Sequence, residues 1–123
     1  MARILVVDDE ASIREIARKL LALHGHAVDV ANDGERALDQ LEKKNYDLVL
    51  LDHYMPKISG IQVVSIIRTS PKYKDLKILM LTSMSVTKNV DEAFEAGIDG
   101  YIIKPFTMKQ LVEKVEKTLL GAR

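Results

Sequence analysis

The chain has 123 residues, of which 47% are hydrophobic and 29% are charged, and its 18 basic residues balance its 18 acidic ones. This is typical of one globular domain, so residues 1–123 are expected to form a single domain. Zero net charge without a Lys/Arg run argues against direct binding to nucleic acid, and no apolar segment is long enough for a membrane span or a signal peptide. With no cysteine in the chain, a cytoplasmic protein is expected.

Short apolar runs alternate along the chain with longer segments of helical spacing. Four of the runs are apolar throughout, which is typical of parallel strands that are covered on both faces. A fifth run, residues 27–31, has Asp29 at its centre and is expected at an edge of the sheet. The four apolar runs are residues 4–7, 48–51, 78–81 and 101–103.

Each run is followed by a pattern that indicates a helix. For the first helix, Ser12 and Glu15 are spaced as a capping box, and for the last helix Thr107 and Gln110 have the same spacing. Five strand-helix units in alternation predict a doubly wound α/β fold, with a parallel sheet and helices on both of its faces. The apolar positions of the five helices include Ile13, Ala17 and Leu20, then Ala37 and Leu41, then Val64 and Ile67, then Ala93 and Phe94, and finally Leu111 and Val115.

Polar residues follow four of the predicted strands: Asp8 and Asp9, then Asp52, Thr82 and Lys104. The carboxyl ends of parallel strands meet at one edge of a sheet, which is where open α/β folds bind ligands. Two like charges about 4 Å apart repel by about 4 kcal/mol at the effective dielectric near a protein surface, so three carboxylates need compensation. Lys104 supplies one positive charge, and Mg²⁺, which prefers carboxylate and phosphate oxygens, suits the remainder.

Four short motifs carry a specific resemblance: VVDDE at 6–10, LDHYMP at 51–56, LTS at 81–83 and KPF at 104–106. In this order and at these spacings the chain resembles the CheY-like receiver domains of two-component response regulators over essentially its whole length. The resemblance implies a flavodoxin-like sheet of five parallel strands in the order 2-1-3-4-5, with five helices.

The same resemblance implies a role for each site residue. Asp52 is the expected phosphoacceptor, which takes a phosphoryl group from a histidine kinase or a phosphotransfer protein. Mg²⁺ is expected to be held by Asp8, Asp9, Asp52 and the backbone carbonyl of Tyr54, and Lys104 is expected to pair with the phosphoryl oxygens. The bond between Lys104 and its following proline is commonly cis in the family.

Thr82 and Tyr101 are the expected switch residues. In the family, the threonine hydroxyl donates to the phosphoryl group and the aromatic side chain turns inward as the neighbouring loop moves. The face built from the fourth helix, the fifth strand and the fifth helix then changes shape for a downstream protein target. Such a domain is a monomer or a phosphorylation-dependent dimer, and it is not a turnover enzyme.

Three positions depart from the family pattern. His53 follows the acceptor directly, where receivers usually carry an apolar residue. Tyr54 and Met84 stand two positions after Asp52 and Thr82, where smaller or polar residues often help to place a hydrolytic water. We therefore expect the phosphorylated form to be longer lived than is usual in the family.

Three other functions remain as alternatives. A haloacid-dehalogenase-like phosphatase also uses an aspartate nucleophile and Mg²⁺, but it needs a second carboxylate two residues later, where Tyr54 stands. A flavodoxin-type cofactor binder needs a Ser-, Thr- and Gly-rich phosphate loop, whereas residues 8–10 are all acidic and would repel the phosphate. The third alternative is a pseudo-receiver that is used only for docking.

Overall fold

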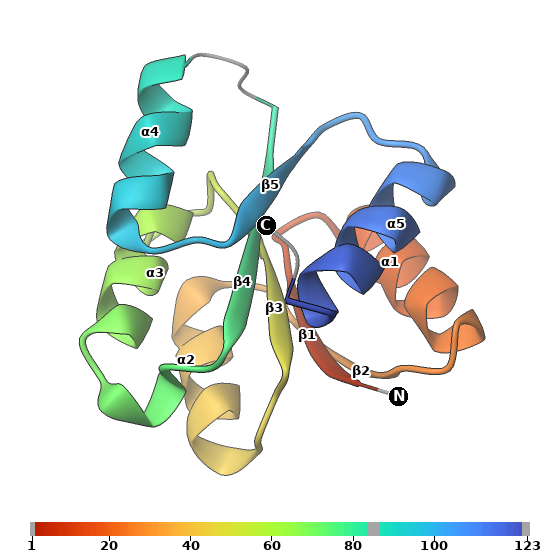
Figure 1. Ribbon diagram of the computed structural model, residues 1–123, viewed down its shortest axis with the longest axis horizontal. Coiled ribbons are helices and arrows are strands. Elements are labelled where there is room, and N and C mark those ends of the chain that lie inside the picture. Colours follow the sequence, from red (N-terminus) through yellow and green to blue (C-terminus); the bar gives the residue numbers. More distant parts are fainter. Residues whose placement is uncertain (1, 84–86, 122–123) are drawn as a thin grey trace.

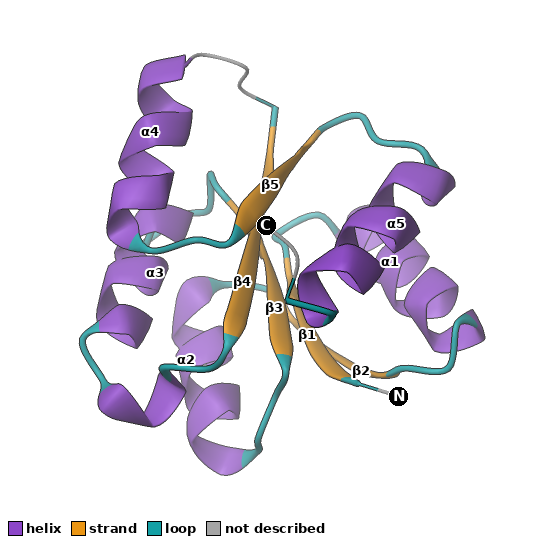
Figure 2. Cartoon of the chain, in the orientation of Figure 1, coloured by secondary structure: helices purple, strands orange, loops and turns teal. Residues whose placement is uncertain are grey.

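Five parallel strands form the centre of the computed structural model, which describes residues 2–83 and 87–121. The strands lie in the order β2-β1-β3-β4-β5, which confirms both the predicted flavodoxin-like topology and the edge position of residues 27–31 (Figure 2). Their bounds are β1 Arg3–Val7, β2 Ala27–Ala31, β3 Leu48–Asp52, β4 Lys77–Thr82 and β5 Gly100–Ile103.

Helices cover both faces of the sheet. Figure 1 shows α1 and α5 together on one face, and α2, α3 and α4 on the other. A short 3₁₀ helix, η1, precedes β4 and was not predicted from the sequence. The helices are α1 Ala11–Leu23, α2 Gly34–Lys43, α3 Gly60–Arg68, α4 Thr87–Ala96 and α5 Met108–Leu119, and η1 is Pro71–Tyr73.

The strands bury apolar side chains on both faces, which explains why their sequences do not alternate with polar residues. In β3, Leu48 and Leu50 pack into the core beneath α1 and α5. Val49 and Leu51 pack into the separate core beneath α2, α3 and α4. Two hydrophobic layers therefore cover the two faces of the sheet, and its central strands β1, β3 and β4 carry polar residues only at their ends.

Helix capping agrees with the sequence at α5 but not at α1. Thr107 and Gln110 form the predicted reciprocal capping box. The predicted box of Ser12 and Glu15 is wrong, because α1 begins one residue before Ser12 and no side chain caps it. The backbone N–H of Glu10, which precedes the helix, instead donates to the carboxylate of Asp8 at 2.9 Å.

A half-buried arginine, Arg68, ties the amino end of the sheet to α3. The guanidinium of Arg68 donates to the carbonyl oxygens of Gly97 and Tyr73 and to the carboxylate of Asp99, at 2.9, 3.0 and 3.1 Å. Asp99 also accepts from the backbone N–H of Ile78 at 2.8 Å. This network fixes the end of the sheet where β4 and β5 begin.

Within the described ranges, no helix has both the length and the apolar character needed to cross a membrane.

Candidate functional site

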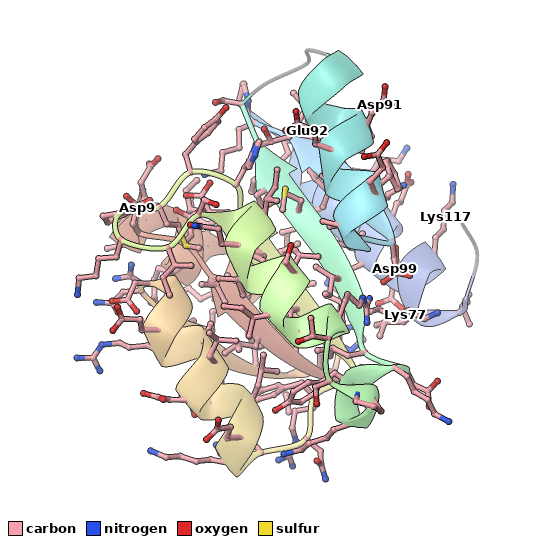
Figure 3. The ribbon with its side chains drawn as sticks, turned by 90° about the vertical axis from the view of Figure 1, so that its left-hand side faces the viewer. Asp9, Lys77, Asp91, Glu92, Asp99 and Lys117 are labelled. Atoms are coloured by element: carbon pink, nitrogen blue, oxygen red, sulfur yellow. The ribbon has the colours of Figure 1, made fainter. Side chains whose placement is uncertain are left out.

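Three carboxylates meet at the carboxyl edge of the sheet. Asp8 and Asp9 directly follow β1, and Asp52 is the last residue of β3. One oxygen from each side chain lies within 4.8 Å of the others, although Asp8 is fully buried and Asp9 is exposed. Figure 3 shows Asp9 at the opposite end of the molecule from Lys77 and Asp99. The cluster therefore lies at the edge where the sequence predicted it.

Lys104 brings a positive charge to these carboxylates from a distant part of the chain. Its Nζ lies 2.8 Å from Oδ2 of Asp8 and 3.4 Å from Oδ1 of Asp52. The backbone N–H of Lys104 donates to the carbonyl oxygen of Thr82 at 2.7 Å, which holds the residue beside the end of β4. The bond between Lys104 and Pro105 is cis, as the resemblance implies.

A glycine allows α3 to begin close to the end of β3. A Cβ atom at Gly60 would lie 2.4 Å from the backbone oxygen of Asp52 and 3.0 Å from Cα of His53. The Gly60 N–H donates to the His53 carbonyl at 2.9 Å, and the His53 N–H donates to the Leu81 carbonyl at 2.8 Å. The backbone that carries Asp52 is therefore held from both sides, and only glycine fits this approach.

The electrostatics of the cluster raise the pKa of Asp52 to about 7. Burial is the largest cause, and the negative charge of Asp8 and the hydrogen bond with Asp9 act in the same direction against the opposing effect of Lys104. Burial would lower the pKa of Lys104, but the hydrogen bond to Asp8 and the charge of Asp52 raise it overall. Lys104 is therefore a cation at neutral pH, while Asp52 is partly protonated unless another positive charge joins the cluster.

The donor set of the cluster suits Mg²⁺. Mg²⁺ binds hard oxygen ligands at about 2.0–2.1 Å, so its ligands lie up to about 4.2 Å apart. One oxygen from each of the three carboxylates lies within 4.8 Å of the others, which is close to this spacing. With all three ionised, Lys104 leaves an excess of negative charge that a divalent cation would offset. Tyr54, whose carbonyl is the fourth predicted ligand, lies in the loop after β3, two residues beyond Asp52.

The two predicted switch residues lie outside the carboxylate cluster. Thr82 ends β4 and is buried, one residue beyond the partner of Asp52 in the register of β3 and β4. Tyr101 lies on β5 and is half-buried, with its ring edge-on to that of Phe94 at 6.1 Å between centroids. Met84, the third residue singled out near the site, lies outside the described residues.

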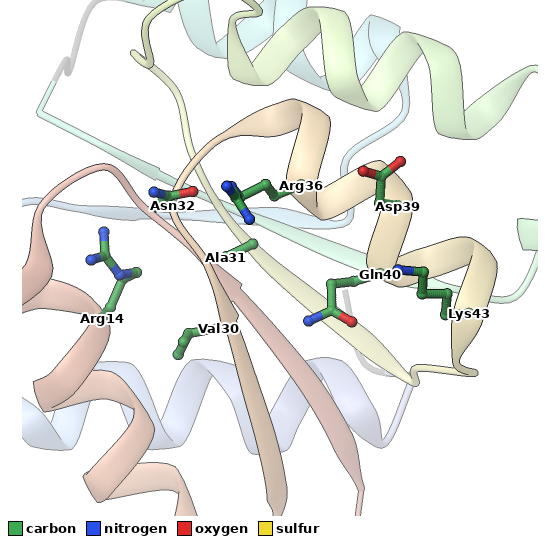
Figure 4. Close-up of a pocket in the computed structure, with 8 residues that line it drawn as sticks. All are labelled: Arg14, Val30, Ala31, Asn32, Arg36, Asp39, Gln40 and Lys43. Carbon is green, nitrogen blue, oxygen red and sulfur yellow. The ribbon is translucent and has the colours of Figure 1, made fainter.

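Two features near the site were not predicted from the sequence. The Nδ1 atom of His53, which directly follows Asp52, lies 3.4 Å from Oγ1 of Thr82 at the end of β4. Beside the cluster, a pocket of about 410 Å³ opens between α1, the end of β2 and α2 (Figure 4). Arg14, Arg36 and Lys43 line this pocket, and Arg14 also donates to the Asp8 carbonyl at 2.8 Å. Arg14 comes from α1, whereas Arg36 and Lys43 come from α2, so sequence spacing alone does not bring the three together.

Comparisons with known proteins agree with this geometry. Residues 4–116 match the model of the response regulator receiver domain. The transcriptional regulatory protein ResD of Bacillus subtilis is 43% identical over 120 residues, which are 98% of this chain and 49% of ResD. The chain thus spans about half the length of ResD. Chemotaxis protein CheY-3 of Vibrio cholerae is 40% identical over 94% of this chain and 89% of its own length.

Solved structures place the chain in the same family. Chemotaxis response regulator CheY4 of Vibrio cholerae superposes with a TM-score of 0.92 at 33% identity, covering 95% of this chain and 98% of that one. A putative response regulator from Chloroflexus aurantiacus has a TM-score of 0.90 at 35% identity, covering 98% of each chain. Sequence, fold and site geometry agree, and the chain belongs to the family of response regulator receiver domains of two-component signalling.

Proposed function

We propose that residues 1–123 form a receiver domain that works as a phosphorylation-activated switch, with Asp52 as the phosphoacceptor. The donor is the phosphohistidine of a histidine kinase or a phosphotransfer protein. One observation carries the proposal: Lys104 bridges Asp8 and Asp52, at 2.8 and 3.4 Å, beside a third carboxylate. This places a nucleophile and a fixed cation where a phosphoryl group can be received.

The chemistry of the proposed transfer follows from the charges of the site. An oxygen of Asp52 forms a bond to phosphorus while the bond between phosphorus and the donor imidazole nitrogen breaks. Mg²⁺ held by Asp8, Asp9, Asp52 and the Tyr54 carbonyl would reduce the repulsion between the anionic nucleophile and the anionic donor. Lys104 then moves its hydrogen bonds from the carboxylates to the phosphoryl oxygens, which keeps the charge of the site balanced.

The proposed output is a change of the face formed by α4, β5 and α5. The Thr82 hydroxyl donates to a phosphoryl oxygen, and the movement of its loop alters the packing of Tyr101 against Phe94 on α4. A downstream protein target reads this face, and the domain acts as a monomer or as a dimer that forms on phosphorylation. We place the protein in the cytoplasm, where it promotes its own phosphorylation and slow dephosphorylation without turning over an external substrate.

Acetyl phosphate with Mg²⁺ tests this proposal, with intact-protein and peptide mass spectrometry as the readout. We expect a single phosphoryl addition on Asp52 that is absent in Asp52→Asn and retained in Asp39→Asn, a control at an exposed aspartate on α2. No addition to the wild-type chain, or addition at another residue, would contradict the proposal. Steady hydrolysis of phosphomonoesters would support the phosphatase instead.

A further inference from the structure

His53 is a buried polar residue in a rigid position. It has 6% exposure, although the motif places it directly after Asp52 in a family whose members usually carry an apolar residue there. Its N–H donates to the Leu81 carbonyl at 2.8 Å, and its own carbonyl accepts from Gly60 at 2.9 Å. Because the backbone is held on both sides and the side chain is buried, the imidazole has little room to change its position.

The ring of His53 lies between two neighbours that matter to the site. Its Nδ1 is 3.4 Å from Oγ1 of Thr82, and its ring centroid is 4.4 Å from that of Tyr54, with the planes 30° apart. The hydrogen bond is long and therefore weak, but both of its partners are buried. If Thr82 moved away, the buried Nδ1 atom of His53 would lose this hydrogen bond, so the contact favours the arrangement in which Thr82 stays beside His53.

We propose that His53 is a positioning residue that holds the Thr82 hydroxyl away from the acceptor site in the unphosphorylated protein. This inference rests on the proposed function, because it concerns the response of Thr82 to a phosphoryl group on Asp52. A hydroxyl has one proton to donate, so Thr82 cannot donate to Nδ1 and to a phosphoryl oxygen at the same time. His53 and the phosphoryl group therefore compete for Thr82, and His53 sets the threshold of the switch.

The competition requires that Nδ1 is the acceptor, with the imidazole proton on Nε2. A neutral imidazole has one donor and one acceptor nitrogen, and the hydrogen bonds of the ring decide which is which. A long-range ¹H–¹⁵N NMR spectrum of the metal-free protein reports this directly. We expect the Nδ1 signal of an unprotonated nitrogen, whereas a protonated Nδ1 would overturn the inference.

The competition is tested by the affinity of the protein for beryllofluoride, which mimics the phosphoryl group. Isothermal titration calorimetry measures this affinity in saturating Mg²⁺ at one fixed pH. His53→Phe keeps an aromatic ring but removes the acceptor, and His53→Asn keeps a polar atom near the position of Nδ1 but removes the ring. The loss of one weak hydrogen bond predicts that His53→Phe binds the mimic about two- to tenfold more tightly. His53→Asn should bind it as the wild type does.

A double-mutant cycle separates the hydrogen bond from a packing effect. In a Thr82→Val background there is no hydroxyl to hold, so His53→Phe should leave the affinity unchanged. Unchanged or weaker binding by His53→Phe alone, or an equal gain in the Thr82→Val background, would overturn the inference. If His53→Phe does not fold, His53→Leu removes the same acceptor and is judged by the same outcomes.

Failure of this inference is distinguishable from failure of the proposed function. If wild-type protein neither binds beryllofluoride nor takes a phosphoryl group on Asp52, the proposed function fails and the inference fails with it. If wild-type protein does both but His53→Phe behaves identically, only the inference fails.

Discussion

The repulsion among the site carboxylates predicts that Asp52→Asn stabilises the metal-free protein at alkaline pH. Folding raises the pKa of Asp52 from 3.8 to about 7, so the folded state binds this proton more tightly than the unfolded state does. The protonated carboxyl therefore stabilises the folded state fully below pH 3.8, and this stabilisation is lost as the pH rises through about 7. Above that pH, the wild-type chain must keep Asp52 charged beside Asp8.

The size of the effect follows from the pKa. A rise from 3.8 to about 7 corresponds to about 4 kcal/mol. Solvent at the open edge of the sheet screens part of this energy, so we expect about 2 kcal/mol. For a chain of 123 residues, this corresponds to a melting temperature about 6–10 °C higher for Asp52→Asn than for wild type.

Thermal unfolding by circular dichroism in EDTA, at pH 4.5 and pH 8.5, measures this difference. We expect a large gain for Asp52→Asn at pH 8.5, a small one at pH 4.5, and a gain that shrinks when Mg²⁺ is added because Mg²⁺ stabilises only the wild type. The matched control is Asp39→Asn, since Asp39 is exposed and should show the same small change at both pH values. An equal gain for Asp52→Asn at both pH values, or no gain at pH 8.5, would refute the electrostatic reasoning.

Three further predictions concern the surroundings of the site. Tyr54 is 52% exposed, and Tyr54→Asn should accelerate loss of the phosphoryl group several-fold by admitting water. Mass spectrometry after removal of acetyl phosphate measures the rate of this loss, and an unchanged or slower rate argues against the prediction. Gly60→Ala places a Cβ 2.4 Å from the Asp52 carbonyl oxygen. It should lower the free energy of unfolding, measured in urea, by more than about 2 kcal/mol. An unchanged free energy of unfolding would mean that the backbone relaxes around the Cβ at no cost. Arg68→Met removes three hydrogen bonds and the cation beside the partly buried Asp99. It should cost about 3 kcal/mol in the same assay. A loss below about 1 kcal/mol would show that the network is dispensable.

The parallel sheet could be predicted from the sequence because its strands are covered on both faces. Continuous apolar runs such as residues 48–51 leave few alternatives, and the parallel topology then brings the residues after each strand to one edge. The meeting of Asp8, Asp52 and Lys104 follows from this topology together with the family motifs. The position of residues 27–31 at an edge of the sheet could be predicted because Asp29 puts a charge at the centre of this strand.

Local side-chain geometry could not be predicted in the same way. The start of α1 was predicted wrongly: the helix begins at Ala11, so Ser12 lies inside it and does not cap it, and the carboxylate of Asp8 accepts the backbone N–H of Glu10 just before the helix. The contact between His53 and Thr82 depends on two rotamers and on the turn after β3. Sequence spacing describes the period of an element, but it does not describe which side chains meet across two elements.

The long separation between the partners of the site has a consequence for biosynthesis. Lys104 bonds to Asp8 across 96 residues, so the first residues of the site are made long before their counter-charge. A nascent or prematurely terminated chain that lacks β5 carries the acidic residues without the lysine that balances them. On the ribosome, the site should stay incomplete until Lys104 has been made and β5 has joined the sheet, so a chain interrupted before that point lacks the cation that contacts Asp8 and Asp52.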